Sequence, residues 1–449
     1  MNTWNILDYG ACFSDRLQTE KIQKAIDDCF LAGGGRVVVP CGVYVTGGLR
    51  LRSRVELYLE SGAILLGSRN PEDYFGFRED KLEPLSVEEI GSTPATGRSA
   101  VSTSRWSNGL LRAFDAEDIA VIGEKGSYLD GQNCFDPEGE ENYRGPHGMS
   151  FWRCRNIRLE GYTFINSSNW CHAIFQSQNI TVRGVSIYSG FDGFDVRTCD
   201  NILVEDCNFY SGDDAIAGFD NNDVTVRNCR LNTACMPLRF GGNNVLVENC
   251  VSDERRFGSR LRLTDEAKIL GELTNDTVRH ESWAPFSYYC DHRADPRKPI
   301  ENVTFRNCRF AQERELIRIE FDGLHRWCCN RPMRSIRFEN CQIEDLQTAG
   351  MIWSTEDEKI TVEYVGCKLS GRPGTKEPIC VAGNFEKILF EDCVIDGFAD
   401  PTILIGTDDP VEFVRTKPIT VKRTTQEECI AAHPTGLASQ DQGKNLRFK

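Results

Sequence analysis

Apolar and polar residues alternate in short runs along most of this chain, and from Ile157 to Cys250 the runs recur about every 22 residues. Such alternation is typical of a β-strand with one buried face. Most runs follow the pattern apolar-x-apolar-x-(Asn/Asp)-Cys-x-apolar, and the break at Asn-Cys predicts a turn between two sheets. The steps are too short for strand–helix units. The pattern therefore predicts an all-β fold, a single-stranded parallel β-helix (a solenoid) with several short strands in each coil.

The first 70 residues have a different pattern from the repeat and predict a helix before the first strands. Apolar residues fall at helical spacing within Thr19–Ala32, and three glycines follow, as is common at the end of a helix. Short β-rich runs come next, at Arg36–Val39, Val43–Val45, Val55–Leu59 and Ala63–Leu65. A helix followed by stacked short strands predicts a cap on the open end of the solenoid.

We expect one structural domain with three parts: an N-terminal cap with the first coils (1–70), the β-helix (71–415) and a polar tail (416–449). Residues 70–115 are less regular and predict loops. Two excursions interrupt the repeat, at 251–300 and 323–333. The first excursion is rich in arginine and aromatic residues and includes Tyr289 and His292. Its composition favours an ordered wall beside a site over a disordered loop.

The cysteines and asparagines of the repeat have a structural interpretation. Cys207, Cys229 and Cys250 occupy equivalent positions, as do Cys308, Cys341 and Cys393. We expect a buried column of reduced thiols. A metal site is the weaker interpretation, because no pair of C-x-x-C motifs is present. Asn228, Asn249, Asn307 and Asn340 recur at the turn and predict a ladder of stacked asparagines.

The net charge, the apolar runs and the cysteine content limit which binding partners and which cellular compartment we expect. The net charge is −15, which disfavours nucleic acid and other long polyanions as partners. No apolar run reaches the roughly 20 residues of a membrane helix, so we expect no membrane partner. The start, MNTWNILDYG, does not read as a secretion signal. Together with 20 cysteines, this predicts reduced thiols and a cytoplasmic location. Nothing in the sequence predicts a cofactor.

Three aspartates recur at the period of the repeat. Asp213 and Asp214 follow Asp192 by 21 and 22 residues. Residues one coil apart lie on adjacent strands, roughly 4.8 Å apart, so the three carboxylates are expected to share one patch. Carboxylates held that close oppose each other's ionisation, which provides an acid and a base at one pH. The alternative is that they are turn formers, like Asp206 and Asp220.

The order of these features resembles the polygalacturonase family, glycoside hydrolase family 28. The resemblance rests on DYGA, IQKAIDDC, GGGRVVVPCGVYVTGGL and LYLESGAILLGS at the start, on RGPHGMSFWRCRNIRLEGYTFINSSNW, and on SGDD at Ser211–Asp214. It covers most of residues 4–250 and is weaker afterwards. It implies a right-handed β-helix and inverting hydrolysis of a glycosidic bond, with Asp213 as general acid and with Asp192 and Asp214 activating the water. Inversion needs room for that water between substrate and base.

Departures from the family pattern bear on the substrate. Cys235 stands where the family has a histidine, and Arg318-Ile319-Glu320 is the best match to its Arg-Ile-Lys, with Glu320 in place of lysine. That lysine grips a galacturonate carboxylate in the family, which Glu320 would repel. Arg239 is a candidate for either missing role, or an exposed strand arginine. Trp170, one coil before Asp192, is a candidate sugar platform. His172 is a candidate contact to the same sugar or a structural histidine.

Three functions stay open. The first is a glycoside hydrolase that takes a pectin-related or other oligosaccharide, with the long excursion closing the groove so that the enzyme acts on chain ends. The second is a polysaccharide lyase of the same fold, for which the aspartates would bind calcium. The third is a non-catalytic carbohydrate-binding β-helix that has lost the family histidine and lysine.

Overall fold

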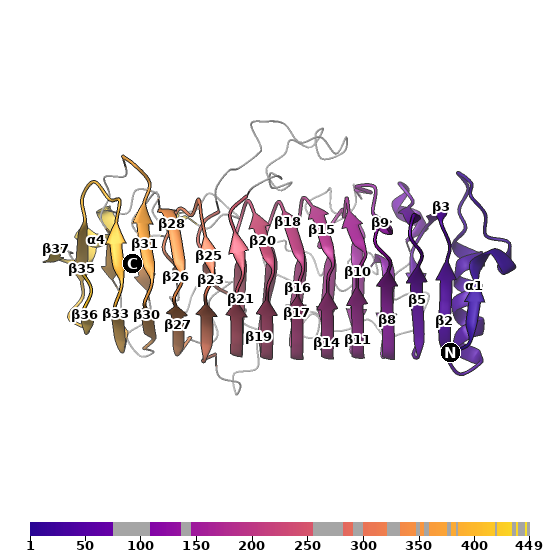
Figure 1. The fold of residues 1–449 in the computed structure, drawn as a ribbon, viewed down its shortest axis with the longest axis horizontal. Helices are drawn as coiled ribbons and strands as arrows, with labels where there is room; N and C mark the ends of the chain where they lie inside the picture. The colour runs from indigo at the N-terminus through magenta and orange to yellow at the C-terminus, as the bar shows by residue number, and fades with distance from the viewer. Residues whose placement is uncertain are drawn as a thin grey trace. The chain divides into compact units, whose positions relative to one another are not determined.

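The computed structural model describes residues 1–74, 108–135, 145–254, 282–290, 300–320, 333–346, 351–353, 359–374, 379–382, 385–417, 420–432, 437–438 and 445–446. The chain divides into two compact units. Among the described residues, the first unit comprises 1–217 and 229–234, and the second comprises 218–228 and 235 onward. Each unit is built from parallel strands that stack coil upon coil, which is the architecture that the alternating pattern predicted (Figure 1).

The N-terminal helix of the first unit forms where helical spacing predicted it. Helix α1 spans Thr19–Leu31, after strand β1 (Thr3–Asn5) and the short helix η1 (Ile6–Tyr9). Its buried residues, Ile22, Ala25, Ile26 and Cys29, are the expected apolar stripe. Gly33 and Gly34 follow with φ of 98° and 104°. These left-handed values cost glycine no steric strain, so the chain turns sharply into the first coil.

Three columns of strands make up the rest of the first unit. Each residue pairs with its equivalent one coil later, as Ile157 pairs with Ile180 and Ile180 with Ile202. The first column is β2 (Gly35–Val39), β5 (Val55–Leu59), β8 (Glu117–Gly123), β11 (Arg155–Glu160), β14 (Gln178–Arg183) and β17 (Asp200–Glu205). The second is β4 (Leu49–Arg50), β7 (Gly109–Phe114), β10 (His147–Trp152), β13 (His172–Phe175) and β16 (Phe194–Arg197). The third is β3 (Gly42–Thr46), β6 (Ala63–Gly67), β9 (Tyr128–Asp130), β12 (Thr163–Ile165), β15 (Ser186–Ser189), β18 (Asn208–Ser211) and β20 (Arg230–Thr233).

The expectation of loops across residues 70–115 is wrong at its end. Pro71–Asp73 forms a short 3-10 helix, η2, but Gly109–Phe114 is strand β7, which pairs with β10. All six residues of β7 are buried. A strand that is buried on both faces loses the alternation of polar and apolar residues, so the pattern on which the prediction rested is absent there.

The second unit repeats the plan after β19 (Ile216–Arg227), a strand that has residues in both units. Its first column is β21 (Leu238–Glu248), β24 (Val303–Arg306), β27 (Ser335–Glu339), β30 (Thr361–Val365), β33 (Lys387–Glu391) and β36 (Val411–Val414). The second continues from β21 to β23 (Phe286–Tyr288), β26 (Arg318–Glu320) and β29 (Met351–Trp353). The third is β22 (Val251–Ser252), β25 (Arg309–Phe310), β28 (Gln342–Leu346), β31 (Lys368–Gly371) and β34 (Val394–Asp396).

Regular structure continues into the segment that the sequence marked as a polar tail. Strands β32 (Ile379–Ala382), β35 (Thr402–Gly406) and β37 (Thr420–Arg423) form a small parallel sheet. Helix α4 (Gln426–Ala432) follows, and β38 (Leu437–Ala438) pairs antiparallel with β39 (Asn445–Leu446). All four residues of β37 are exposed, so no apolar alternation revealed this strand. Within the described residues, no helix is long and apolar enough to cross a membrane.

The cysteine and asparagine columns have the structural roles that the repeat predicted. The buried thiols of Cys341, Cys367 and Cys393 donate hydrogen bonds of 3.5, 3.3 and 3.2 Å to carbonyl oxygens of the preceding coil. Asn249 donates to Asn228 at 3.4 Å, and Asn307 donates to Asn249 at 3.5 Å. These three asparagines have φ between 52° and 54°. Asparagine tolerates that left-handed conformation better than most residues, which explains its place in the turn.

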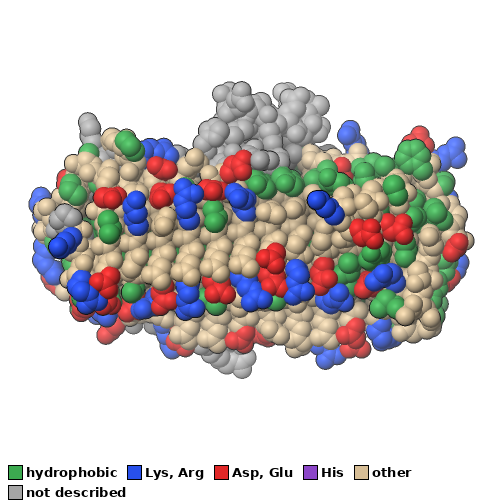
Figure 2. Space-filling view, viewed as in Figure 1, with side chains coloured by type: hydrophobic (Ala, Val, Ile, Leu, Met, Phe, Trp, Pro, Cys, Tyr) green, Lys and Arg blue, Asp and Glu red, His purple; other side chains and the backbone are tan. Residues whose placement is uncertain are grey.

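Charged side chains on the outer faces of the strands alternate in sign from coil to coil, and Figure 2 shows rows of interspersed blue and red. In the first unit, Arg183 pairs with Glu205. In the second, Arg306 pairs with Glu339 at 2.9 Å, and Arg337 with Glu363 at 2.6 Å. Opposite charges at matching positions of adjacent strands stabilise the stacking of coils. These rows therefore have a structural explanation.

Candidate active site

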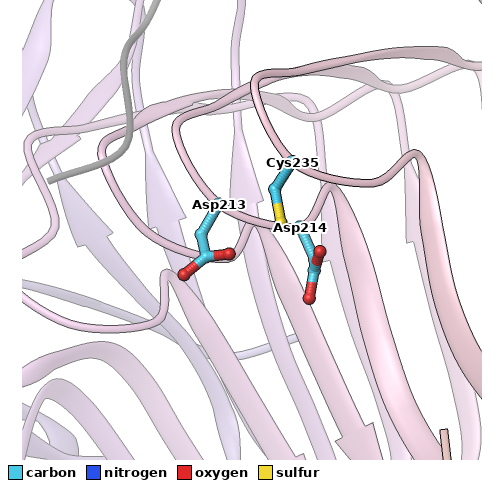
Figure 3. Close-up of side chains that lie close together, drawn as sticks. All are labelled: Asp213, Asp214 and Cys235. Atoms are coloured by element: carbon cyan, nitrogen blue, oxygen red, sulfur yellow. The ribbon is translucent and has the colours of Figure 1, made fainter. Parts of the chain in front are cut away.

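The turn after β18 carries two of the three predicted catalytic aspartates. Strand β18 ends at Ser211 and β19 begins at Ile216, so Asp213 and Asp214 lie outside both strands. In a regular strand two adjacent side chains point to opposite faces. The turn removes that restriction, and Figure 3 shows the two carboxylates close together on the same turn.

Asp192 lies one coil earlier, in the turn between β15 and β16. The backbone N–H of Asp214 donates a hydrogen bond of 3.1 Å to Oδ1 of Asp192, and Gly193 donates from its backbone to the carbonyl of Asp214 at 2.9 Å. Asp192, Asp213 and Asp214 are 6, 9 and 1% exposed. The fold thus brings three carboxylates that are distant in the sequence into one nearly enclosed group, with Asp213 the most accessible.

The backbone of Asp213 is held by a residue that sequence reasoning missed. The hydroxyl of Thr233, at the end of β20, donates a hydrogen bond to the carbonyl of Asp213. Thr233 is buried at the position on β20 that matches Ser211 on β18. In the sequence, the only indication of this contact is that small hydroxyl residues recur at the same place in successive coils. These residues are Ser189, Ser211 and Thr233. This contact fixes the backbone at Asp213, in the turn that carries both aspartates.

The indole of Trp170 is buried, with a histidine ring and a guanidinium packed on it. The His147 ring stacks on it with centroids 5.3 Å apart, and the Arg197 guanidinium lies 4.4 Å from the centroid of the indole. Arg197 is itself held by two bonds to Asp195, of 2.8 and 2.9 Å. A buried indole with these contacts offers little surface to a sugar, so the contacts favour a packing role. The Asp195–Arg197 pair was also missed, and its only signal was the i, i+2 spacing on β16.

His172 lies in the interior of the first unit rather than at its surface. Its side chain is fully buried, with Nε2 2.8 Å from the Tyr162 hydroxyl and Nδ1 3.2 Å from the carbonyl oxygen of Gly193. Burial lowers the pKa of His172 to about 4 because it disfavours the charged imidazolium. The surroundings are those of the structural histidine that the sequence left open as an alternative.

The remaining predicted site residues belong to the second unit. Cys235 is buried in a cluster with Met236 and Trp283, and the backbone N–H of Trp283 donates a hydrogen bond of 2.8 Å to the carbonyl oxygen of Cys235. Arg239 on β21 holds its guanidinium 4.6 Å from the centroid of the Tyr289 ring. Arg318 begins strand β26 and Glu320 ends it. His292 lies outside the described residues.

Part of this chain, including the turn with the aspartates, is similar to known glycoside hydrolases. Residues 81–234, which include all three aspartates, match the family of glycosyl hydrolases family 28. A probable polygalacturonase from Vitis vinifera is 26% identical over 227 residues, which cover 47% of this chain and 43% of the relative. An exo-poly-α-D-galacturonosidase from Dickeya chrysanthemi is 28% identical over 249 residues, covering 47% and 41%. The stretch of this chain that carries the three aspartates is therefore similar to family 28.

The fold of this chain matches solved structures over most of its length. An exopolygalacturonase from Thermotoga maritima superposes with a TM-score of 0.61 at 20% identity, covering 90% of this chain and 91% of the other. A family 28 exopolygalacturonase from Yersinia enterocolitica gives 0.58 at 18% identity, with 94% and 78% covered. The fold is a right-handed parallel β-helix. The matches to the two curated relatives span less than half the length of either.

Proposed function

We propose that this chain is a glycoside hydrolase of family 28 that releases sugar from the end of a pectin-related oligosaccharide. The observation that carries the proposal is the bond from the Asp214 N–H to Asp192, because it joins two coils into one group of three carboxylates. The two exopolygalacturonases of similar fold support attack on a chain end, and the Dickeya chrysanthemi relative supports a galacturonide as the sugar.

In the proposed reaction, Asp213 gives its proton to the leaving glycosidic oxygen as the bond to the anomeric carbon breaks. A water molecule attacks that carbon from the opposite face, and Asp192 or Asp214 takes the proton that the water loses. The product has the inverted anomeric configuration, and no covalent intermediate forms. Asp213 is the best candidate for the general acid because its side chain is the most exposed of the three, whereas Asp214 is enclosed beside Asp192.

The test is the digestion of oligogalacturonides of defined length, with the anomeric proton of the first product followed by NMR. We expect the β-anomer from an α-linked substrate, and monosaccharide from the earliest times if the enzyme acts on chain ends. Asp213→Asn should lower kcat by about 10²–10⁴-fold, the usual contribution of a general acid. The matched control is Asp206→Asn, an exposed turn aspartate with φ of 55°, which should keep full activity.

Other outcomes would replace the proposal. Retained configuration would remove the inverting mechanism, and equal turnover in Asp213→Asn would remove Asp213 from it. An unsaturated product that depends on added calcium would identify a lyase, because β-elimination leaves a double bond in the sugar. Binding of oligogalacturonide with no product under any condition would identify a non-catalytic carbohydrate-binding β-helix.

A further inference from the structure

The Asp192–Gly193 peptide is held by hydrogen bonds from the coils on both sides. From the preceding coil, the backbone N–H of Cys171 donates to the carbonyl of Asp192 at 2.8 Å. The backbone N–H of His172 donates to the carbonyl of Gly193 at 3.2 Å. In the following coil, the Asp214 carbonyl accepts the Gly193 N–H at 2.9 Å, and the Asp214 N–H donates to Oδ1 of Asp192 at 3.1 Å. The position of this one peptide therefore affects two of the three carboxylates of the candidate active site.

The turn at Gly193 packs directly against the next coil. A β-carbon placed on Gly193 would lie 2.6 Å from the Phe209 ring and 2.8 Å from the carbonyl oxygen of Ala215. Both distances are shorter than van der Waals contacts, so no side chain fits there. Interiors packed this densely transmit a displacement instead of absorbing it. A shift of the Gly193 carbonyl would therefore move the Asp192 carboxylate beside it.

One side chain reaches this turn from the interior of the first unit. The His172 ring places Nδ1 3.2 Å from the Gly193 carbonyl oxygen and Nε2 2.8 Å from the Tyr162 hydroxyl. A carbonyl oxygen can only accept, so Nδ1 carries the proton. Burial lowers the pKa of His172 to about 4, so the ring is neutral above that pH and Nε2 accepts from Tyr162. The result is a directed series of hydrogen bonds from hydroxyl to imidazole to carbonyl.

Aromatic rings enclose the imidazole and restrict its orientation. Tyr162 stacks on the His172 ring with centroids 6.0 Å apart, and Phe164 and Phe194 meet that ring edge-on at 5.9 and 6.2 Å. Tyr162 and His172 are both fully buried. Polar groups in apolar surroundings are costly unless their hydrogen bonds are made. Packing and hydrogen bonding therefore hold the ring in the same orientation.

We propose that His172, oriented by Tyr162, is a positioning residue that holds the Asp192–Gly193 peptide through the Gly193 carbonyl. The ring acts on the backbone and not on a sugar, because its side chain is fully buried. Holding this peptide keeps the Asp192 carboxylate where the Asp214 N–H binds it. An inverting enzyme needs its carboxylates at a set separation, since a water molecule must fit beside the base. The effect on catalysis rests on the proposed function, whereas the effect on the turn does not.

Two substitutions of His172 separate the roles of the two ring nitrogens. Asparagine places its amide N–H at the position of Nδ1, whereas the longer glutamine places its amide at the position of Nε2. Both variants remove the same ring, so both should lower the free energy of unfolding in urea. We expect His172→Asn to keep kcat on oligogalacturonide within about twofold of the parent. His172→Gln should lower kcat about five- to tenfold, the effect of one hydrogen bond, with KM unchanged.

Tyr162→Phe tests the other end of the series, because it removes the hydroxyl that orients the ring. It should lower kcat in the same direction as His172→Gln. The control is Ser177→Ala, which removes a different buried hydroxyl of the first unit. The Ser177 hydroxyl accepts the Cys154 N–H at 2.9 Å and donates to the Phe175 carbonyl at 2.8 Å. Its loss should lower the free energy of unfolding and leave kcat unchanged.

A kcat that falls equally in His172→Asn and His172→Gln, or in neither, would overturn the proposal. A fall of the same size in Ser177→Ala would do so too, because kcat would then follow stability alone. Hydrogen exchange followed by mass spectrometry tests the turn without turnover. Peptides that contain Gly193 and Asp214 should exchange faster in His172→Gln than in His172→Asn, and equal exchange would contradict the proposal. A parent protein that releases no product would sink the proposed hydrolysis, while the exchange would still decide whether His172 holds the turn.

Discussion

Asp192 accepts a hydrogen bond from the backbone of Asp214, at 3.1 Å, although 22 residues separate the two along the chain. The contact joins a side chain of one turn to the backbone of the next. It therefore restrains Asp192 independently of the charge on Asp214. Any change at residue 192 has two separable effects, one on the acceptor oxygen and one on the negative charge.

Asp192→Asn and Asp192→Ala should separate these effects. Asparagine keeps an oxygen that accepts the Asp214 N–H but loses the charge, whereas alanine leaves that buried N–H without its acceptor. We expect both variants to lose turnover of oligogalacturonide, and only Asp192→Ala to lower the free energy of unfolding, by about 1–3 kcal/mol. Urea unfolding and a reducing-sugar assay measure the two. Full turnover in Asp192→Asn would exclude this carboxylate from the reaction.

Thr233 should act as a positioning residue for Asp213. Thr233→Val keeps the shape of the side chain but removes the hydroxyl that bonds the Asp213 carbonyl. The loss of one hydrogen bond, about 1 kcal/mol, should lower kcat by about five- to tenfold and leave KM unchanged, because the Thr233 side chain is buried away from solvent.

The hydroxyl-preserving variant Thr233→Ser provides the control and should restore kcat. If valine and threonine give the same kcat, or if serine fails to restore it, the contact does not position Asp213. A parallel loss of kcat and stability in all Thr233 variants would indicate packing alone.

His172 should make the fold sensitive to acid. Its pKa is about 4 in the folded chain against 6.5 for an ordinary histidine, so the unfolded chain binds the extra proton first. The stabilisation is present above pH 6.5 and is lost as the pH falls from 6.5 towards 4, by about 3 kcal/mol at most. Urea unfolding at several pH values in this window measures the loss.

His172→Gln removes the titrating group while keeping a polar side chain near Tyr162 and the Gly193 carbonyl. Its unfolding free energy should vary less between pH 6.5 and 4 than that of the parent. Identical slopes for the two proteins would show that another group controls the acid response. A selective rise in KM for the sugar would instead place His172 at the substrate.

Much of the fold could be predicted from the sequence because the signal is local and repeated. The helical spacing within α1 is a local pattern, and the strands flanked by Asn-Cys and the ladder of Asn228, Asn249 and Asn307 recur at a fixed place in the coil. Strand β7 was missed for the opposite reason, since its six buried residues show no alternation. Strand β37 was missed because all four of its residues are exposed.

The sequence by itself determined the coil length, and with it that Asp213 and Asp214 lie one coil after Asp192. Only the tertiary structure decided what surrounds them: the Thr233 hydroxyl on the Asp213 carbonyl, Arg197 over Trp170, and the buried contacts of His172. The physical reason is that a period along the chain sets which residues are neighbours across coils. The direction and contacts of each side chain depend on how several coils pack together, which no single repeat encodes.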